Sequence, residues 1–260
     1  MKKILNKIIR PSLLLGGLSV IIVIGFYAYI SSRPGVNPSL VPTPTKIIQT
    51  FASEIANGEL LNNTKASLAR VIAGFLIGSS LAILIGCVAG WFRIWGYILN
   101  PLIDAIRPIP ALAYIPLVIV WVGIDEPSRI IIITLAVFKP CVVNARAGMQ
   151  EVAQIYVDAA KTLGASALRI FWTIAIPSSV PYLIAGMRTA LSTGFLALVA
   201  AELIAAPSGL GFMIQNAGQY FRTDVVIVGI IVIGIVGAVL DQIARMVGLY
   251  LTSWSDVRKT

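Results

Sequence analysis

Several charged side chains stand inside long apolar runs of the sequence, where a charge is costly unless it has a role, and six of them bear on function. They are Asp104, Arg107, Lys139, Arg188, Glu202 and Asp241. A charge that faces lipid would cost roughly 2.5–3.5 kcal/mol or more, so we expect these side chains to face the interior of a helix bundle, water or one another. The cations could attract an anion, and the carboxylates could bind protons or sodium ions.

The chain has few side chains that could catalyse a reaction. There is no histidine, which removes the usual general base and the commonest metal ligand. Cys87 and Cys141 lie inside apolar runs and are too few for a disulfide framework. The sequence has no G-x-x-x-x-G-K-[ST] motif that would hold ATP phosphates. We therefore expect no catalytic residue, metal site or cofactor in this chain, and an intramembrane enzyme is a remote alternative.

The composition points to a membrane protein. Of the 260 residues, 58% are hydrophobic and only 12% are charged, whereas soluble domains average roughly 45–50% apolar and about 25% charged residues. Soluble enzymes, disordered chains and fibrous proteins are therefore excluded as classes. The net charge of +9 could indicate nucleic-acid binding in a soluble chain, but here it favours a cationic membrane protein with no nucleic-acid partner.

Six apolar runs are long enough to cross a bilayer as helices. They cover residues 13–30, 68–91, 98–123, 130–148, 180–205 and 225–251. The first run could instead be a signal peptide, because Lys2, Lys3, Lys7 and Arg10 precede it, but its length and the lack of a clean cleavage site favour a retained helix. The expected fold is a single all-α polytopic membrane domain over residues 1–260.

The distribution of basic residues predicts the orientation. The basic amino terminus, the carboxyl-terminal Arg258 and Lys259, and the loop with Lys161 and Arg169 are all expected in the cytoplasm. Residues 34–64 and 206–224 then face the outside. Within the first of these segments we expect Thr45 to cap a short helix on the outer surface.

Two of the predicted spans carry further information. The second has small residues at every fourth position, which lets another helix approach closely; these are Gly74, Gly78, Ala82, Gly86 and Gly90. The third is interrupted by Pro108, Pro110 and Pro116. Such irregular backbone is tolerated at membrane depth only inside protein or beside a watery cavity. The alternative for the third span is a merely kinked packing helix.

These features give a candidate translocation path for an anion. Its members are Arg107, Pro108, Pro110, Lys139, Arg188 and Glu202. Each charged member also has a mundane alternative: Arg107 could pair with Asp104 one turn back, and Lys139 could extend toward a membrane interface. Glu202 could tie helices together or orient an outer gate.

The cytoplasmic segment 149–178 reads as two short helices. Residues 152–163 form the first, Gly164 breaks it, residues 165–174 form the second, and Pro177 ends that helix before the next span. Such an apolar-faced pair suits a groove on a partner protein. The alternative is an amphipathic helix that rests on the inner leaflet.

The same segment resembles a known motif. Asp158-Ala159-Ala160, three residues, Gly164, nine residues and then Ile174-Ala175-Ile176-Pro177 are similar to the EAA loop of binding-protein-dependent ABC importer permeases, E-A-A-x3-G-x9-I-x-L-P. Asp158 replaces Glu and Ile176 replaces Leu, while the spacing is intact. In that family the loop docks on the ATP-binding subunit. The resemblance thus implies an ATPase-coupling loop with Asp158, Ala159, Ala160, Leu163, Gly164, Leu168, Ile174 and Pro177.

Further stretches narrow the resemblance. Residues 107–124 resemble the taurine, sulfonate, nitrate and bicarbonate permease group, and residues 198–226 and 251–254 are similar to taurine permeases in particular. This implies the type I ABC importer permease fold with six transmembrane helices, in a bacterial cytoplasmic (inner) membrane. The implied ligand is a small anion, taurine or another sulfonate, with nitrate or bicarbonate as alternatives.

The resemblance also implies partners and a mechanism. A second copy of the chain would form a homodimer, two ATP-binding subunits with ATP and Mg would sit on the cytoplasmic side, and an external substrate-binding protein would deliver the ligand. ATP would then drive alternating access. The rival from another class is an ion-coupled secondary transporter, for which Asp104, Glu202 and Asp241 would be the ion-binding carboxylates, although no inverted repeat is visible.

Overall fold

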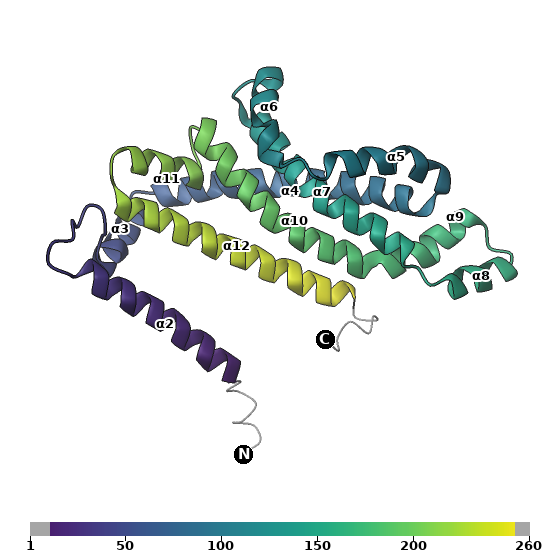
Figure 1. Cartoon of the computed structure of the whole chain (residues 1–260), viewed down its shortest axis with the longest axis horizontal. Helices are drawn as coiled ribbons and strands as arrows, with labels where there is room; N and C mark the ends of the chain where they lie inside the picture. Colours follow the sequence, from purple (N-terminus) through teal and green to yellow (C-terminus); the bar gives the residue numbers. More distant parts are fainter. Residues whose placement is uncertain (1–10, 253–260) are drawn as a thin grey trace, which may run out of the picture.

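A computed structural model describes residues 11–252, whose regular elements are all helices (Figure 1). The basic residues at both ends that carried part of the orientation argument, and Trp254, lie outside this range. The helices are α2 Pro11–Ser31, α3 Pro44–Ala56, α4 Glu59–Trp91, α5 Arg93–Ile106, η1 Ala111–Tyr114, α6 Ile115–Val122, α7 Glu126–Gln150, α8 Gln154–Thr162, α9 Ala167–Ile170, η2 Phe171–Ala175, α10 Ile176–Ala205, α11 Leu210–Gln219 and α12 Thr223–Leu251.

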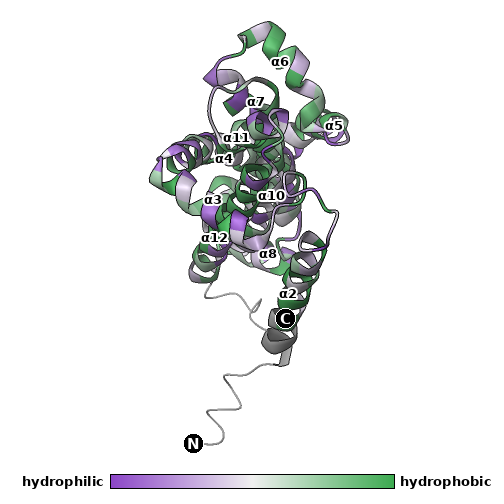
Figure 2. Cartoon of the chain, turned by 90° about the vertical axis from the view of Figure 1, so that its left-hand side faces the viewer, coloured by the Kyte–Doolittle hydropathy of each residue, from purple (hydrophilic) through white to green (hydrophobic). Residues whose placement is uncertain are grey.

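Four stretches of the described chain are long and apolar enough to cross a membrane. They are α4, α7, the continuous stretch Ala167–Ile204 and α12. The pair of α5 with η1 and α6 passes the same test together, but it is bent by 89° at its break. In α2, which covers the first predicted span, the apolar stretch Ile21–Ser31 is shorter. Figure 1 shows α2 standing apart from the other long helices. In Figure 2 the coloured part of α2 is mostly green, which marks hydrophobic residues.

The stripe of small residues on α4 packs directly against α7. A Cβ atom added to Gly78 would lie 2.7 Å from the carbonyl oxygen of Thr134, and one added to Gly86 would lie 2.6 Å from the Cβ of Ala145. Only glycine allows the two backbones this approach. The predicted close helix contact is therefore confirmed, and α7 is the helix that makes it.

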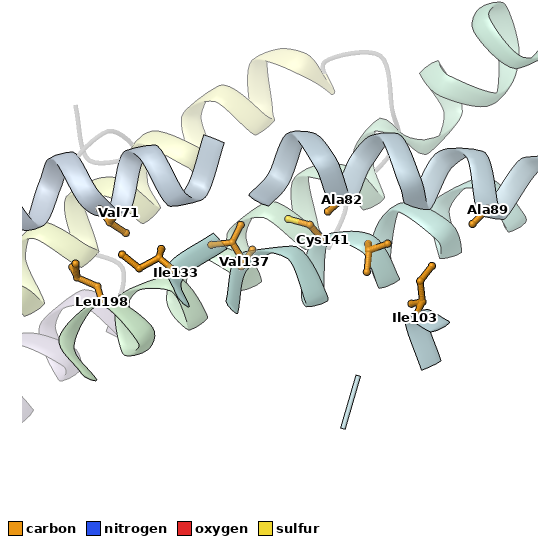
Figure 3. Packing of buried hydrophobic residues seen from close by; sticks show 10 residues of the cluster. Val71, Ala82, Ala89, Ile103, Ile133, Val137, Cys141 and Leu198 are labelled. Carbon is orange, nitrogen blue, oxygen red and sulfur yellow. The ribbon is translucent and has the colours of Figure 1, made fainter. Parts of the chain in front are cut away.

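The core between these helices is built from small and branched side chains. Val71 of α4, Ile133 and Val137 of α7, and Leu198 of α10 belong to one buried cluster (Figure 3). Because α4 carries small residues at the contact, the branched side chains of α7 fill the space between the helices. The result is a close-packed group of α4, α7 and α10 that supports the rest of the molecule.

The third predicted span is broken where its prolines predict. Helix α5 ends at Ile106, Pro108 and Pro110 lie in the break, and Pro116 sits in the first turn of α6, where its missing N–H is harmless. Helix α6 then projects from the bundle at the top of Figure 1. Prolines could predict the break, but not the 89° turn that follows it.

Segment 149–178 follows the prediction at its turn and departs from it at its end. Gly164 has a φ of +79° between α8 and α9, the left-handed conformation that favours glycine. However, α9 continues through a π turn at Phe171–Ala175 into α10, and Pro177 lies in the first turn of α10. The prediction that Pro177 ends a helix is therefore wrong, because the π turn directly before Pro177 changes the hydrogen-bond register there and the helix continues.

The opposite end of the bundle carries α3 and α11 (Figure 1). Thr43, rather than the predicted Thr45, caps α3, and its side chain accepts a hydrogen bond from the backbone N–H of Lys46. The Thr50 hydroxyl donates to Asp224 at 2.7 Å, and Arg222 lies 3.1 Å from Glu54. These two contacts fasten α3 to the start of α12.

Candidate functional site

A cavity of about 460 Å³ lies beside the broken span, between η1, α7 and α10. Its walls are mostly apolar, and its polar side chains are Arg107, Lys139, Asn144 and Thr193. Pro108 and Pro110 also line it. The structure thus brings four of the six predicted path residues to one cavity, namely Arg107, Pro108, Pro110 and Lys139.

Lys139 reaches the break from α7. Its Nζ donates to the carbonyl oxygen of Ile109 and lies 5.7 Å from the centre of the Tyr114 ring. The side chain therefore points at the interrupted backbone. Because the broken span provides both a carbonyl and an aromatic face, an ammonium group can be held there at membrane depth.

Arg107 is exposed at the cavity and has no ion-pair partner among residues 11–252. The alternative pairing with Asp104 is not formed, because Asp104 instead lies 3.0 Å from Arg146 of α7. A guanidinium that stays free beside a cavity can donate hydrogen bonds to an anion with a planar fork of N–H groups.

Arg188 lies outside this cavity, on α10 opposite Asp241 of α12. Their closest atoms are 3.2 Å apart, and the two side chains are 43% and 46% exposed. From this pair toward the cavity, α10 exposes Thr189, Ser192 and Leu196, and Leu196 itself lines the cavity. Their spacing of three and four residues is that of a single helix face. Arg188 itself lines a separate apolar pocket between α4, α10 and α12, so α10 carries both the ion pair and part of the cavity wall.

Glu202 also lies outside the cavity and is only 1% exposed. It accepts hydrogen bonds from Arg70 Nη1 at 2.6 Å, from Ser67 Oγ at 2.8 Å and from the backbone N–H of Gly211 at 2.8 Å. These donors come from α4 and α11, so the geometry favours the role of tying helices together.

Arg70 extends this buried network to α7. Its guanidinium also contacts Glu126 at 2.6 Å and the carbonyl oxygen of Ser208 at 2.6 Å. The sequence predicted neither Arg70 as the partner of Glu202 nor Glu126 as the second carboxylate on Arg70. A signal was available for Arg70, because it too is a charge within a predicted span. Its pairing with residues far along the chain has no local signature.

At the other end, α8 and the start of α10 enclose an apolar hollow of about 690 Å³. Ala159, Ala160, Leu163, Ile174 and Pro177 line it. Leu163 is 88% exposed, and Leu168, which does not line the hollow, is also exposed. An apolar surface of this kind is typical of a contact with another protein.

Asp158 of α8 is a surface residue in this arrangement. Its carboxylate accepts a hydrogen bond from Gln154 at 2.9 Å and lies 3.7 Å from Lys161. These contacts stay within one helix, and the charge is available to a partner.

Comparison with known proteins gives consistent matches. Residues 67–249 match the family described as "Binding-protein-dependent transport system inner membrane component". The taurine transport system permease protein TauC of Escherichia coli is 36% identical over 250 residues, which cover 94% of this chain and 90% of TauC. The nitrate import permease protein NrtB of Synechocystis is 30% identical over 245 residues, covering 91% and 86%. A structure of the MetNI methionine ABC transporter matches with a TM-score of 0.58 at 18% identity, covering 75% of this chain and 98% of that one.

Proposed function

Because the chain belongs to the binding-protein-dependent transport system inner membrane components, we propose that its cavity beside the broken span carries a small organic sulfonate. The chain is a multi-pass inner-membrane permease subunit of an ABC importer, with the type I fold. ATPase subunits and a substrate-binding protein are the partners that this family implies. The ligand, the path and the assembly are the proposed parts.

The lining of the cavity supports an organic anion. Arg107 and Lys139 provide positive charge, while Ile109, Leu112 and Leu196 are apolar wall residues. A sulfonate with a short carbon chain could place its charged group at the cations and its carbon chain against the apolar wall. Nitrate and bicarbonate have no apolar part, so they could make no favourable apolar contact with most of this wall. The similarity to TauC points the same way.

The path proposal extends from this cavity along α10 to the Arg188–Asp241 pair. Ions that are half exposed at membrane depth need water or protein beside them, because lipid would leave them unsatisfied. A second copy of the chain that faces this side of α10 across a watery path would provide both. We therefore propose a homodimer whose two α10 helices line the path, with both termini in the cytoplasm.

The coupling proposal rests on the exposed apolar surface of the cytoplasmic segment. Leu163 and Leu168, together with the hollow between α8 and α10, form a site for the ATP-binding subunit. Since α9 and α10 form one continuous stretch, a displacement of this segment would be transmitted directly to the helix that lines the proposed path. ATP binding and hydrolysis would thus be converted into alternating access.

The test is uptake by the complete complex in proteoliposomes, with its ATPase subunits and binding protein. We expect ATP-dependent uptake of taurine or another alkanesulfonate, little uptake of nitrate, and a loss of about tenfold or more in Lys139→Gln. Val143→Ala, in the same cavity wall but without a charge, is the matched control and should retain most uptake. Nitrate uptake that exceeds sulfonate uptake would overturn the proposed ligand.

A further inference from the structure

A second, more polar cavity lies at the outer end of the bundle. It has a volume of about 320 Å³ and is enclosed by α3, α4, α11 and the start of α12. Its charged and amide side chains are Glu54, Glu59, Asn62, Asn63, Asn216 and Arg222, and Tyr220 also lines it. None of these residues lines the cavity beside the broken span. The two cavities are therefore separate and differ in the charge that they offer.

Glu54 is the unusual member of this group. It is 3% exposed, and its Oε1 accepts a hydrogen bond from Arg222 at 3.1 Å. Its Oε2 is buried and has no hydrogen-bond partner within the described part of the chain. Leaving a buried carboxylate oxygen without a donor is costly, and native proteins rarely do so without a reason. A donor that is not part of this chain would satisfy it.

The surroundings define the chemistry of that donor. Two carboxylates, Glu54 and Glu59, and one guanidinium, Arg222, line the cavity, so it is negative on balance and disfavours an anion. A metal ion would have too few ligands here, because residues 11–252 contain no group of three or more His, Cys, Asp or Glu side chains that could hold one. A primary ammonium group has three N–H donors, which suits carboxylate and amide oxygens.

We propose that this outer cavity binds the primary ammonium group of a small organic molecule, with Glu54 Oε2 as its main acceptor and Glu59 at the rim. This inference rests on the proposed sulfonate transport: the molecule is then an aminosulfonate, which meets the outer cavity before it enters the path. The permease would then distinguish aminosulfonates from sulfonates without an amine. The outer site would bind the ammonium end of the ligand first, and the cationic cavity beside the broken span would bind its sulfonate end later on the path.

Direct binding tests the site without reference to transport. Ethylammonium is titrated against the purified complex of permease and ATPase subunits, and its binding is followed by saturation-transfer NMR. We expect saturable binding that weakens about fivefold or more in Glu54→Gln. Arg222→Gln breaks the same ion pair from the other side, yet it should bind ethylammonium equally or more tightly because a competing cation is gone. Equal losses in the two variants, or no binding to the wild type, would overturn the proposal.

Glu59→Gln is the second variant, since the Glu59 side chain makes no hydrogen bond or ion pair within the described residues. It should assemble normally and weaken ethylammonium binding by a smaller factor than Glu54→Gln. Normal binding in Glu59→Gln together with normal binding in Glu54→Gln would remove the acidic groups from any ligand role.

Uptake then links the site to the ligand. Taurine and ethanesulfonate are compared in the same proteoliposomes with one unchanged binding protein, so that its selectivity cancels in the ratio of variant to wild type. Glu54→Gln should reduce taurine uptake about fivefold and leave that of ethanesulfonate within about twofold. Equal effects on both ligands would contradict the ammonium site, whereas ethylammonium binding without any sulfonate uptake would contradict only the proposed function.

Discussion

Single residues that look alike in the sequence fall into two groups once their burial is known. Glu202 and Arg70 are 1% and 4% exposed, and each finds its partners within the protein. Arg107 and Lys139 instead line a cavity. A charge in an apolar run predicts that a partner or a polar surface is nearby, but only tertiary structure decides which of the two it is.

The first prediction at this scale concerns the buried network. Arg70→Leu leaves Glu202 buried without its cation, and breaking a buried pair in this way costs about 3–5 kcal/mol. We expect a marked fall in the Tm of the purified complex. Lys161→Gln, which removes the partner of the exposed Asp158, should cost about 1 kcal/mol or less. Equal Tm values for the two variants would contradict the structural role of Arg70.

The second concerns the turn at Gly164. An added Cβ would have nothing within 4 Å, so a larger residue is opposed by the backbone φ of +79° rather than by a clash. Gly164→Val should be strained by about 1–3 kcal/mol, remain inserted in the membrane, bind the ATPase weakly and lose import. Gly164→Asn is the control, because asparagine tolerates this conformation. Wild-type transport by Gly164→Val would refute the coupling assignment.

Whole elements were predictable where the signal is local. The stripe from Gly74 to Gly90 predicted a close helix contact, and the prolines of the third span predicted its break. The sequence could not name α7 as the partner of the stripe or set the 89° bend, because both depend on what packs nearby. The failure at Pro177 has the same cause: whether a proline ends a helix depends on its surroundings, and the π turn before Pro177 carries the helix past it.

The prediction for an element concerns the contact between α4 and α7. In Gly78→Ala the new Cβ would stand 2.7 Å from a backbone oxygen of α7, and backbone cannot move aside easily. The variant should be destabilised by about 1–3 kcal/mol, seen as a lower Tm and a lower yield of assembled complex. Gly234→Ala on α12 is the matched control, since nothing lies within 4 Å of the added atom. Equal yields and Tm values would show that the helices are not in close contact.

On the scale of the whole molecule, the described chain leaves both apolar helices and an ion pair exposed. Helix α6 projects from the bundle with Val120 and Trp121 exposed, α2 stands apart (Figure 1), and the Arg188–Asp241 pair is half exposed. Lipid could cover the apolar helices but not the ion pair. Variants of this ion pair therefore provide the best test of whether the chain works alone or shares a path with a second copy.

The last prediction uses that pair. Arg188→Glu places a second carboxylate beside Asp241, so we expect import to collapse by about tenfold or more through the inverted field. Assembly and ATP hydrolysis should survive if water lines the path, because water can solvate both carboxylates. If the pair is buried between helices, the repulsion should instead lower the yield of complex. The double variant Arg188→Glu with Asp241→Arg restores the ion pair in reverse and thereby separates packing from transport. Uptake per assembled complex should stay low in this variant when the ligand needs a cation on α10, and its full recovery would leave Arg188 and Asp241 as packing residues only.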